Sequence, residues 1–377
     1  MFFRLIAKEL SIVFRGITVY ILFAAIGMFY FSQYASEVNP AEIMASEGLL
    51  KSEISHTVDV TGPDEEMIIL AKQILSDIER KKIMRMGFLN SYADLTQEKH
   101  IALILALKEL TGGWDGQGTP KIIVSYERYL EIVRNLDKKL GGGTHYGDNN
   151  RRLILQRPMT DAEKDENYNI VIAEDKISGI FARLFADYMG ITAGIFPIFI
   201  CAFVLIKDKR SRMRELIYMR NISSAARVSA SLLAAFTALI ICYLPYLAHA
   251  GISFSIAAIK GGFSIDHLAF LKYFLGWIVP TLFFVTCLGV FISILFDNAI
   301  PAILVQFALS FFSIYPLQGS YGLGKAVIRY NSLDNNQVFS SYRSAIAANR
   351  IFFIVISIVL AAGAIVIWDR RRTNYRA

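Results

Sequence analysis

Cysteine, histidine and proline are scarce in this sequence, with 3, 5 and 9 of them in 377 residues. No HExxH, CxxC or Ser/His/Asp arrangement is present, and His56, His100 and His145 stand too far apart for the spacing of metal ligands. The sequence therefore indicates neither a catalytic residue nor a metal site. The three cysteines all lie in long apolar stretches, so the large segment before residue 185 has no disulfide framework: Cys201, Cys242 and Cys287.

Charge is nearly absent from six long apolar stretches. About 20 helical residues, rising about 1.5 Å each, cross the roughly 30 Å hydrocarbon core of a bilayer. A soluble core helix is the alternative, but such helices are rarely apolar on every side for so long. The fold class that we predict is an all-α polytopic membrane protein with six transmembrane helices. The stretches are Gly16–Ser36, Gly190–Ile206, Val228–Ile259, Tyr273–Phe296, Asn298–Leu323 and Ile351–Trp368.

Two of these stretches need to be divided or shortened. Residues 273–323 contain a single charge, Asp297, and one helix of that length would be far too long for one crossing. Asp297 to Pro301 offers helix-capping residues and a proline suited to a first turn, so we expect two antiparallel helices joined there. Val228–Ile259 contains Pro245 and Gly251, and we expect its span to end near Leu247, followed by an interfacial or re-entrant piece.

The orientation follows from the basic residues beside the stretches. Lys and Arg collect on the cytoplasmic side of membrane proteins. They cluster before the first stretch, after the second and after the last, whereas the first stretch is followed by no basic residue until Lys51. Both ends are therefore expected in the cytoplasm. The first stretch should be retained, because residues 31–34 make a poor signal-peptidase site.

Net charge differs between two parts of the chain. Residues 35–185 carry 19 Lys/Arg and 24 Asp/Glu, a net charge of −5, while the whole chain has +7. The positive excess therefore lies beside the membrane, where it meets anionic head groups and sets the topology. Nucleic-acid binding is not indicated.

The segment between the first two stretches is long enough for a separate extracellular domain. Its patterns are mainly helical, with minor β structure. We expect helices at Glu65–Met86 after Asp64, Thr96–Leu110 before Gly112, Ser125–Leu140 before Gly141, and Glu174–Tyr188 leading into the second span, with short strands at Leu153–Leu155 and Tyr168–Ala173.

Two motifs in the loops are decoys. The acidic residues of 161–166 lack the glycine and the spacing of an EF-hand loop, so a solvated acidic turn is expected. Gly319–Ala326 nearly matches the nucleotide-binding GxxxxGK[ST] motif, but Ala326 replaces the hydroxyl residue and no buried strand precedes it. We expect no ATP hydrolysis by this chain alone.

The resulting domain plan runs through the whole chain. The spans are expected at 16–36, 186–206, 226–250, 272–296, 299–317 and 350–368. On the cytoplasmic side we expect an amphipathic interface helix at 1–15, a loop with a short helix at 207–225 and a tail at 369–377. On the outer side we expect an extracellular domain at 37–185, an extracellular or interfacial loop at 251–271 and an extracellular loop at 318–349.

The cytoplasmic loop contains a short helix with a narrow apolar face. Met213, Leu216 and Ile217 recur at i, i+3 and i+4 amid basic residues. A basic anchor needed for topology alone is one interpretation.

Four features together resemble the ABC-2 (type V) family of bacterial ABC transporter permeases. They are the amphipathic Phe2–Leu10, the segment Arg183–Gly190 with Pro197 beyond it, the segment Arg214–Ser224, and Ala348–Phe353 opening a last span that ends in arginines. The segment Lys138–Gly143 is similar to one in the outer domains of some such permeases.

The resemblance implies a permease subunit of an ATP-driven exporter in the bacterial plasma membrane. Two permease chains, identical or different, would pair with two separate ATPase subunits that bind ATP and magnesium, so this chain itself would bind no cofactor. An interface helix would carry Arg4, Lys8 and Glu9. The segment that resembles the coupling helix would dock on an ATPase through Met213, Arg214, Glu215, Leu216, Ile217, Tyr218 and Arg220.

The substrate is not indicated by the sequence. Four polar residues in the apolar stretches are candidates for the substrate path, although hydrogen bonding between helices is the more ordinary role for each: Gln33, Thr281, Thr286 and Gln306. A membrane-anchored sensor, whose outer domain binds a ligand without transport, is the alternative function. An intramembrane enzyme is disfavoured because the spans nearly lack ionisable groups.

Overall fold

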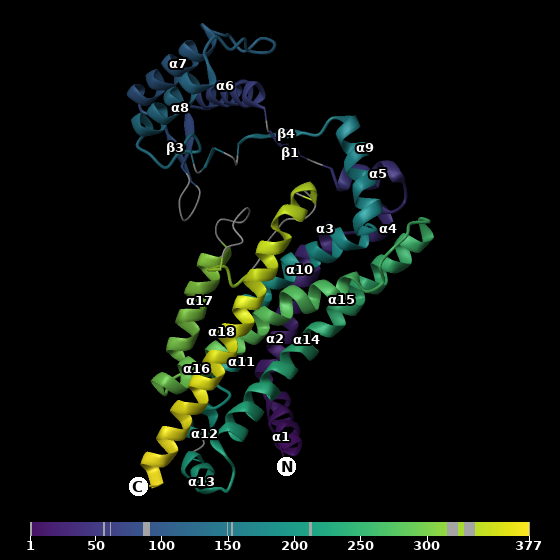
Figure 1. Ribbon diagram of the computed structural model, residues 1–377, viewed down its shortest axis with the longest axis vertical. Helices are drawn as coiled ribbons and strands as arrows, with labels where there is room; N and C mark the ends of the chain where they lie inside the picture. The colour runs from purple at the N-terminus through teal and green to yellow at the C-terminus, as the bar shows by residue number, and fades with distance from the viewer. Residues whose placement is uncertain are drawn as a thin grey trace. The chain divides into compact units, whose positions relative to one another are not determined.

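The chain folds mainly into helices, in two compact units (Figure 1). The computed structural model describes residues 2–55, 57–60, 62–85, 91–148, 150–151, 154–210, 213–314, 323–327 and 336–376. One unit, here called the bundle, comprises Met1–Ser55 and Ala162–Ala377. The other, the inserted unit, comprises His56–Asp161.

The bundle is built from helices of very different lengths. Its elements in chain order are α1 Phe2–Arg15, α2 Ile17–Phe29, η1 Tyr30–Tyr34, α3 Ala35–Glu37, α4 Pro40–Ile43, α5 Glu47–Glu53, α9 Asp161–Ile170, η3 Val171–Asp175, α10 Ser178–Ile195, α11 Ile198–Cys201, α12 Ile206–Arg210, α13 Arg214–Met219, α14 Ser224–Lys260, α15 Ala269–Tyr273, η4 Phe274–Ile278, α16 Val279–Phe296, α17 Ile300–Ile314 and α18 Asn336–Arg376. The three η elements are short π-helical segments.

Five helical stretches of the described chain are long and apolar enough to cross a membrane: Ile17–Ile43, Ser178–Lys209, Ser224–Lys260, Ala269–Phe296 and Tyr342–Asn374. They confirm the predicted all-α membrane fold. A shorter apolar helix, α17, occupies the place of the remaining expected span, and the last part of that span lies outside the described residues.

Two helix boundaries differ from those expected. Helix α14 does not end near Leu247 but continues through Pro245 to Lys260. A proline removes one backbone hydrogen bond, and the neighbouring helices hold the rest of the turn in place. Helix α18 begins at Asn336, inside the expected loop at 318–349. The polar residues before Ile351 end the apolar run but do not end the helix.

One break in the helix precedes the second span and another lies within it. Lys176 and Ile177 have positive φ angles, so the helix expected to run from Glu174 into the span is broken before Ser178. Further along, α10 ends at Ile195, and a new short helix follows Pro197, whose ring cannot continue the hydrogen-bond ladder.

The turn expected at Asp297 is confirmed. Asp297 takes the left-handed conformation at the end of α16, with φ 51°, and Asn298 Oδ1 accepts a hydrogen bond of 3.1 Å from the backbone N–H of Ile300. The Asp297 carboxylate pairs with Lys209 Nζ at 2.5 Å and with Arg371 at 3.1 Å. The turn is thereby tied to the ends of α12 and α18.

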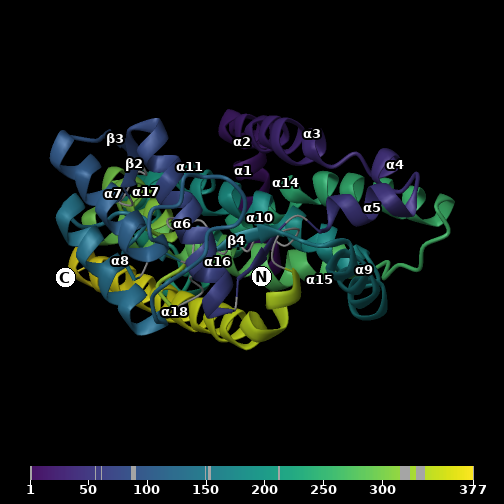
Figure 2. The same cartoon turned by 90° about the horizontal axis from the view of Figure 1, so that it is seen from above.

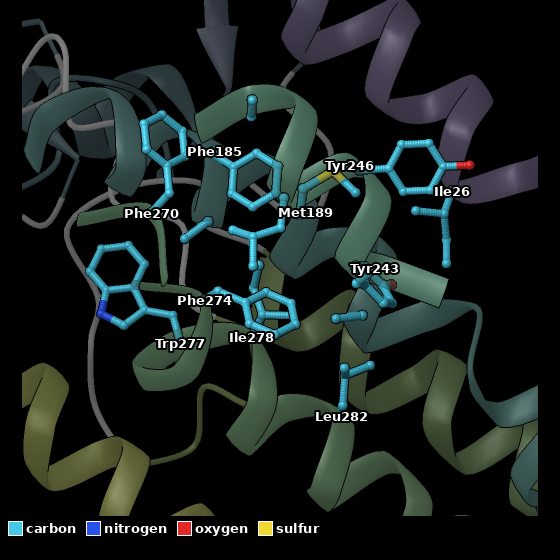
Figure 3. Close-up of a cluster of buried hydrophobic side chains, with 14 of the residues drawn as sticks. Ile26, Phe185, Met189, Tyr243, Tyr246, Phe270, Phe274, Trp277, Ile278 and Leu282 are labelled. Atoms are coloured by element: carbon cyan, nitrogen blue, oxygen red, sulfur yellow. The ribbon is translucent and has the colours of Figure 1, made fainter. Parts of the chain in front are cut away.

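Aromatic side chains fill much of the bundle core (Figure 3). Phe185 of α10 packs against Phe270 of α15, with ring centroids 5.9 Å apart. The hydroxyl groups of Tyr243 in α14 and Thr192 in α10 form a hydrogen bond of 2.9 Å. Each hydroxyl thus has a partner in an interior that contains no water to bind it.

Small residues bring some helices close together. A Cβ atom at Gly289 of α16 would lie 2.9 Å from side-chain atoms of Ile198 and Cys201 in α11, so glycine is required for this approach. Helix α16 also contacts α10, α14, α17 and α18. Seen from above, α2 and α18 lie on opposite sides of α10 and α16 (Figure 2).

The inserted unit packs three helices beside two small sheets. Its elements are β1 Thr57–Asp59, α6 Pro63–Arg80, β2 Lys82–Arg85, β3 Ser91–Asp94, α7 Gln97–Thr111, α8 Tyr126–Leu140 and β4 Gln156–Pro158. Strands β1 and β4 pair antiparallel, as do β2 and β3. The expected helices at 96–110 and 125–140 are confirmed, with Gly112 and Gly141 as left-handed C-caps.

Two expectations for this segment and its exit were wrong. The first long helix ends at Arg80 rather than Met86, because Lys81 takes a left-handed conformation and the following residues form β2 around the buried Ile83. Residues 168–173, expected as a strand, lie in α9 and η3 of the bundle. The acidic residues of 161–166 form the first turns of α9, where they suit the helix dipole, and the strand expected at Leu153 lies partly outside the described residues.

A buried carboxylate joins α6 of the inserted unit to the loop after α8. Asp77 of α6 accepts hydrogen bonds from Gln73 at 2.8 Å and from the Tyr146 hydroxyl at 2.7 Å, and His145 Nε2 lies 2.9 Å from it. Burial and the neighbouring Asp77 carboxylate raise the pKa of Tyr146, so its hydroxyl stays protonated as a donor. This polar contact fixes the loop after α8 onto α6.

Candidate functional site

The basic segments of the chain meet at one end of the bundle. The N-terminus, α12, α13 and the C-terminal end of α18 all lie there (Figure 1). Ion pairs connect α1, α12, α14 and α18 or their adjoining turns at this end. We call it the basic end.

A buried network of four charges holds α1 at the basic end. Glu9 is 4% exposed and accepts from Arg227 of α14 and, at 2.7 Å, from Lys207 of α12. Arg227 also donates to Asp208 at 2.7 Å. Burial by itself raises the pKa of Glu9, but Arg227 and Lys207 together outweigh it and hold that pKa below its usual value. Glu9 is therefore ionised near neutral pH.

The other two residues expected on the interface helix lie outside this network. Arg4 and Lys8 are exposed, whereas Glu9 faces α14, against which α1 packs. The amphipathic pattern of the sequence predicted the helix correctly. It did not predict that a carboxylate would be the buried group, because the partners Lys207 and Arg227 are distant in sequence.

Helix α13 is fastened to α18 along one face. The Tyr218 ring is 4% exposed and packs edge-on against Trp368, with centroids 5.3 Å apart. Arg372 donates to the backbone carbonyls of Tyr218 at 3.1 Å, Arg220 at 2.7 Å and Ile222 at 2.5 Å. A cation that binds the last carbonyls of a helix stabilises its C-terminus.

The opposite face of α13 is exposed and apolar. Met213 is 44% exposed, Leu216 59% and Met219 67%, and the side chain of Glu215 is exposed beside them. Ile217 was expected on this face but is half-buried against the bundle core. The sequence pattern missed Met219, which the spacing of three residues from Leu216 would have indicated. The structure describes Arg214 in the first turn of α13 and Arg220 at its C-cap.

A comparison with protein families identifies the chain. The family described as ABC-2 family transporter protein matches residues 12–326, which is most of the sequence. This chain belongs to the ABC-2 transporter family. Comparisons with curated proteins and with solved structures found no match. ABC-2 permeases are the membrane-embedded transport subunits, so α13 and the network around Glu9 belong to such a subunit.

The four residues expected along a substrate path of this ABC-2 permease are not gathered in one place. Gln33 is exposed on η1. Thr286 donates to the carbonyl of Leu282 at 2.7 Å within α16. Gln306 of α17 donates to the carbonyl of Gly194 in α10 and to Ser310 at 3.0 Å.

Thr281 belongs to a separate cluster in the ABC-2 permease. Its hydroxyl accepts from Arg350 of α18 at 2.8 Å and lies 3.2 Å from the carbonyl of Ala326. Arg350 is 5% exposed and also donates to the carbonyls of Trp277, Lys325 and Ala326. The cluster holds the described residues 323–327 against α16 and α18. Arg350 was not among the expected site residues, although a basic residue at the start of an apolar run is the signal that marks it.

The part of the chain that the structure describes contains no group of three or more residues placed to hold a metal ion. Of the decoy motif Gly319–Ala326, residues 319–322 lie outside the described ranges. Ala326 itself is buried beside Arg350.

Proposed function

We propose that this chain is the permease subunit of an ATP-driven exporter and that separate ATPase subunits dock on the exposed face of α13. Membership in the ABC-2 transporter family supports the role of a permease subunit. ATP and magnesium would bind to the ATPase subunits. A second permease chain would complete the complex, and the substrate would move outward.

The single observation that carries this proposal is the two-faced packing of α13. One face is bound to α18 through Tyr218 and Arg372, while Met213, Leu216 and Met219 form an exposed apolar surface. An exposed apolar surface of this kind needs a protein groove or a membrane surface to cover it. Glu215 beside it favours a protein partner, since an acidic residue is unfavourable at an anionic leaflet.

The basic end of the bundle would face the cytoplasm. Lys and Arg concentrate on the cytoplasmic side of membrane proteins, and the three basic segments of this chain meet at that one end. Each terminus then lies in the cytoplasm. The inserted unit lies between the first and second spans in the sequence, so it would be extracellular.

The contacts at the basic end provide a route for motion. A force on α13 would reach α18 through the Tyr218–Trp368 packing and the Arg372 hydrogen bonds. Tilting of α14 would displace α1 and α12, because Arg227 holds Glu9 and Asp208 together. Closure of two ATPase subunits on ATP could thus change the relative positions of the spans.

Site-directed photo-crosslinking tests the proposed docking surface. A photoreactive phenylalanine derivative would replace Leu216 or Met219 in the full chain in its native cells, with Leu49 of α5 as the control. Leu49 is 49% exposed and lies beyond the first span. We expect both α13 positions, but not position 49, to give an adduct with a subunit that binds ATP. Adducts with lipid alone at both α13 positions would contradict the proposal.

A further inference from the structure

A cavity of about 660 Å³ opens near the first residues of three candidate spans. Its walls come from the start of α10, from α15 and η4, and from α18. None of the described lining residues belongs to α13 or to the Glu9 network. Charged side chains line one part of the cavity and apolar side chains line another.

The cavity lies at one boundary of the membrane. Ser178, Ala269 and Tyr342 are the first residues of three candidate spans, and residues close to each of them line the cavity. Two aromatic residues in the wall, Tyr273 and Trp277, are of the type enriched at membrane–water boundaries (Figure 3 labels Trp277). The other ends of these spans reach the basic end, where Lys209, Asp297 and Arg371 meet. The cavity is therefore at the boundary opposite α13.

The charged part of the cavity is cationic. Among the residues that the structure describes, its lining contains Lys176, Lys272, Arg343 and Arg350 and the two acidic residues Glu174 and Asp266. Lys272 is paired with Asp266 at 2.5 Å, and this hydrogen bond lowers the pKa of the Asp266 carboxyl. Asp266 is therefore ionised and paired with Lys272, and the positive charge of Lys176 lowers the same pKa further without forming an ion pair.

Two cations remain at the rim of the cavity. Lys176 and Arg343 are exposed, and neither has a carboxylate within ion-pair distance among the side chains that the structure describes. Arg350 adds a third positive charge in the inner wall, where its donors are used by backbone carbonyls and by Thr281. These charges favour an anion at the rim.

The apolar lining residues lie further along the candidate spans than Lys272 and Arg343 do. Leu275 is 53% exposed, Ile351 62% and Ile354 38%, and all three lie within candidate spans. A molecule dissolved in the bilayer could thus reach the cavity laterally. A soluble anion would leave this apolar surface uncovered.

We infer that this cavity binds an anionic phospholipid of the bilayer, with its phosphate between Lys176 and Arg343 and an acyl chain along Leu275, Ile351 and Ile354. Basic pockets between spans bind anionic head groups at the cytoplasmic side of membrane proteins, and this cavity presents the same kind of lining at the opposite boundary. A phospholipid needs a cationic surface for its phosphate and an apolar surface for its acyl chain, and the lining of this cavity provides both. This inference does not depend on an ATPase partner, so it can fail or hold independently of the proposed function.

The test uses the full chain in bilayer discs that contain a photoreactive phosphatidylglycerol or the matching phosphatidylcholine, with the diazirine on an acyl chain. Adducts are mapped by mass spectrometry. One variant carries Lys176→Gln with Arg343→Gln, and a second carries Gly276→Phe. A Cβ atom at Gly276 meets nothing within 4 Å, so the phenyl ring should fill the cavity without disturbing its wall. Lys260→Gln is the matched control, since Lys260 is an exposed lysine at the end of a span and does not line this cavity.

We expect phosphatidylglycerol to label the peptides that contain Leu275 and Ile351, and phosphatidylcholine to label them much less. Each removed charge should weaken binding about fivefold, so the double variant should bind roughly 25-fold more weakly. Gly276→Phe should also remove the labelling, and Lys260→Gln should retain it. Equal labelling by the two lipids, or labelling that both cavity variants retain, would overturn the inference. Absence of labelling by either lipid would also overturn it, since the cavity would then hold no phospholipid.

Discussion

Tyr218 of α13 packs edge-on against Trp368 of α18, with their ring centroids 5.3 Å apart. This contact buries the Tyr218 ring almost completely and leaves the opposite face of α13 exposed. A helix of six residues is too short to be stable in water by itself, so its conformation depends on this packing and on Arg372.

Replacement of Arg372 should loosen α13. In Arg372→Gln the carbonyls of Tyr218, Arg220 and Ile222 lose their charged donor, and we expect a local loss of about 1–3 kcal/mol. Hydrogen exchange of residues 214–222 should become faster in the purified permease. Arg370→Gln is the control, because Arg370 is an exposed arginine two residues earlier in the same helix. Equal exchange in the two variants would contradict a capping role for Arg372.

The Glu9 network should make stability depend on acid pH. The pKa of Glu9 is lowered in the folded chain, so its contribution is complete above the unfolded pKa, about 4.3, and is lost as the pH falls through the folded value. Glu9→Gln should lower the free energy of unfolding at pH 7 by about 3 kcal/mol, because Arg227 and Lys207 lose a buried carboxylate.

Melting temperatures of wild type and Glu9→Gln in detergent measure this effect. The difference between them should be large and nearly constant from pH 8 to about pH 5, and it should shrink below about pH 4. Glu42→Gln serves as the control, since Glu42 is exposed near the other end of the first span. A difference that grows on acidification would contradict the assigned charges.

The inserted unit should fold as a separate domain. A fragment of residues 57–161 keeps both strands of the β1–β4 pair and the core around α6, α7 and α8. Within it, Tyr146→Phe removes a donor to the buried Asp77 and should cost about 1–3 kcal/mol, which corresponds to a fall in Tm of roughly 5–15 °C. Tyr92→Phe, at a side chain 63% exposed, should leave the Tm nearly unchanged. Non-cooperative melting of the fragment would show that it is not a domain.

The proposed orientation can be tested with cysteines. The native Cys201, Cys242 and Cys287 are buried, so they provide a low background. In intact cells a membrane-impermeant maleimide should label Thr119→Cys in the inserted unit and miss Asn374→Cys in α18. Thr119 is exposed in the segment between α7 and α8, so a cysteine there is accessible to the reagent. The reverse labelling pattern would invert the topology.

The sequence was most informative where long-range contacts matter least. Runs of apolar residues located the spans, and the residues around Asp297 located the turn, since both signals are local. The predicted helix boundaries were wrong where a helix continues beyond its apolar part, as α18 does before Ile351. The same holds for Pro245, which packing within the bundle tolerates inside α14.

The candidate site was predicted in part for the same reason. Spacing along the chain identified α13 and its apolar side chains, but it could not distinguish Ile217, which packs inward, from Met219, which is exposed. Arg227 and Arg372 act through partners far away in the sequence. Their roles become visible only when the helices are assembled.

The most direct test of the docking of an ATPase on α13 is the effect of Leu216→Asp on the purified complex. Leu216 is 59% exposed, so a charge there should leave the permease folded, whereas the half-buried Ile217 is unsuitable for this purpose. An apolar contact at the centre of an interface typically contributes 2 kcal/mol or more, so we expect the ATPase subunit recovered with the permease to fall at least about tenfold, together with ATP hydrolysis. Leu49→Asp, at a similarly exposed leucine beyond the first span, should change neither quantity. Full recovery of the ATPase and full hydrolysis with Leu216→Asp would contradict the account.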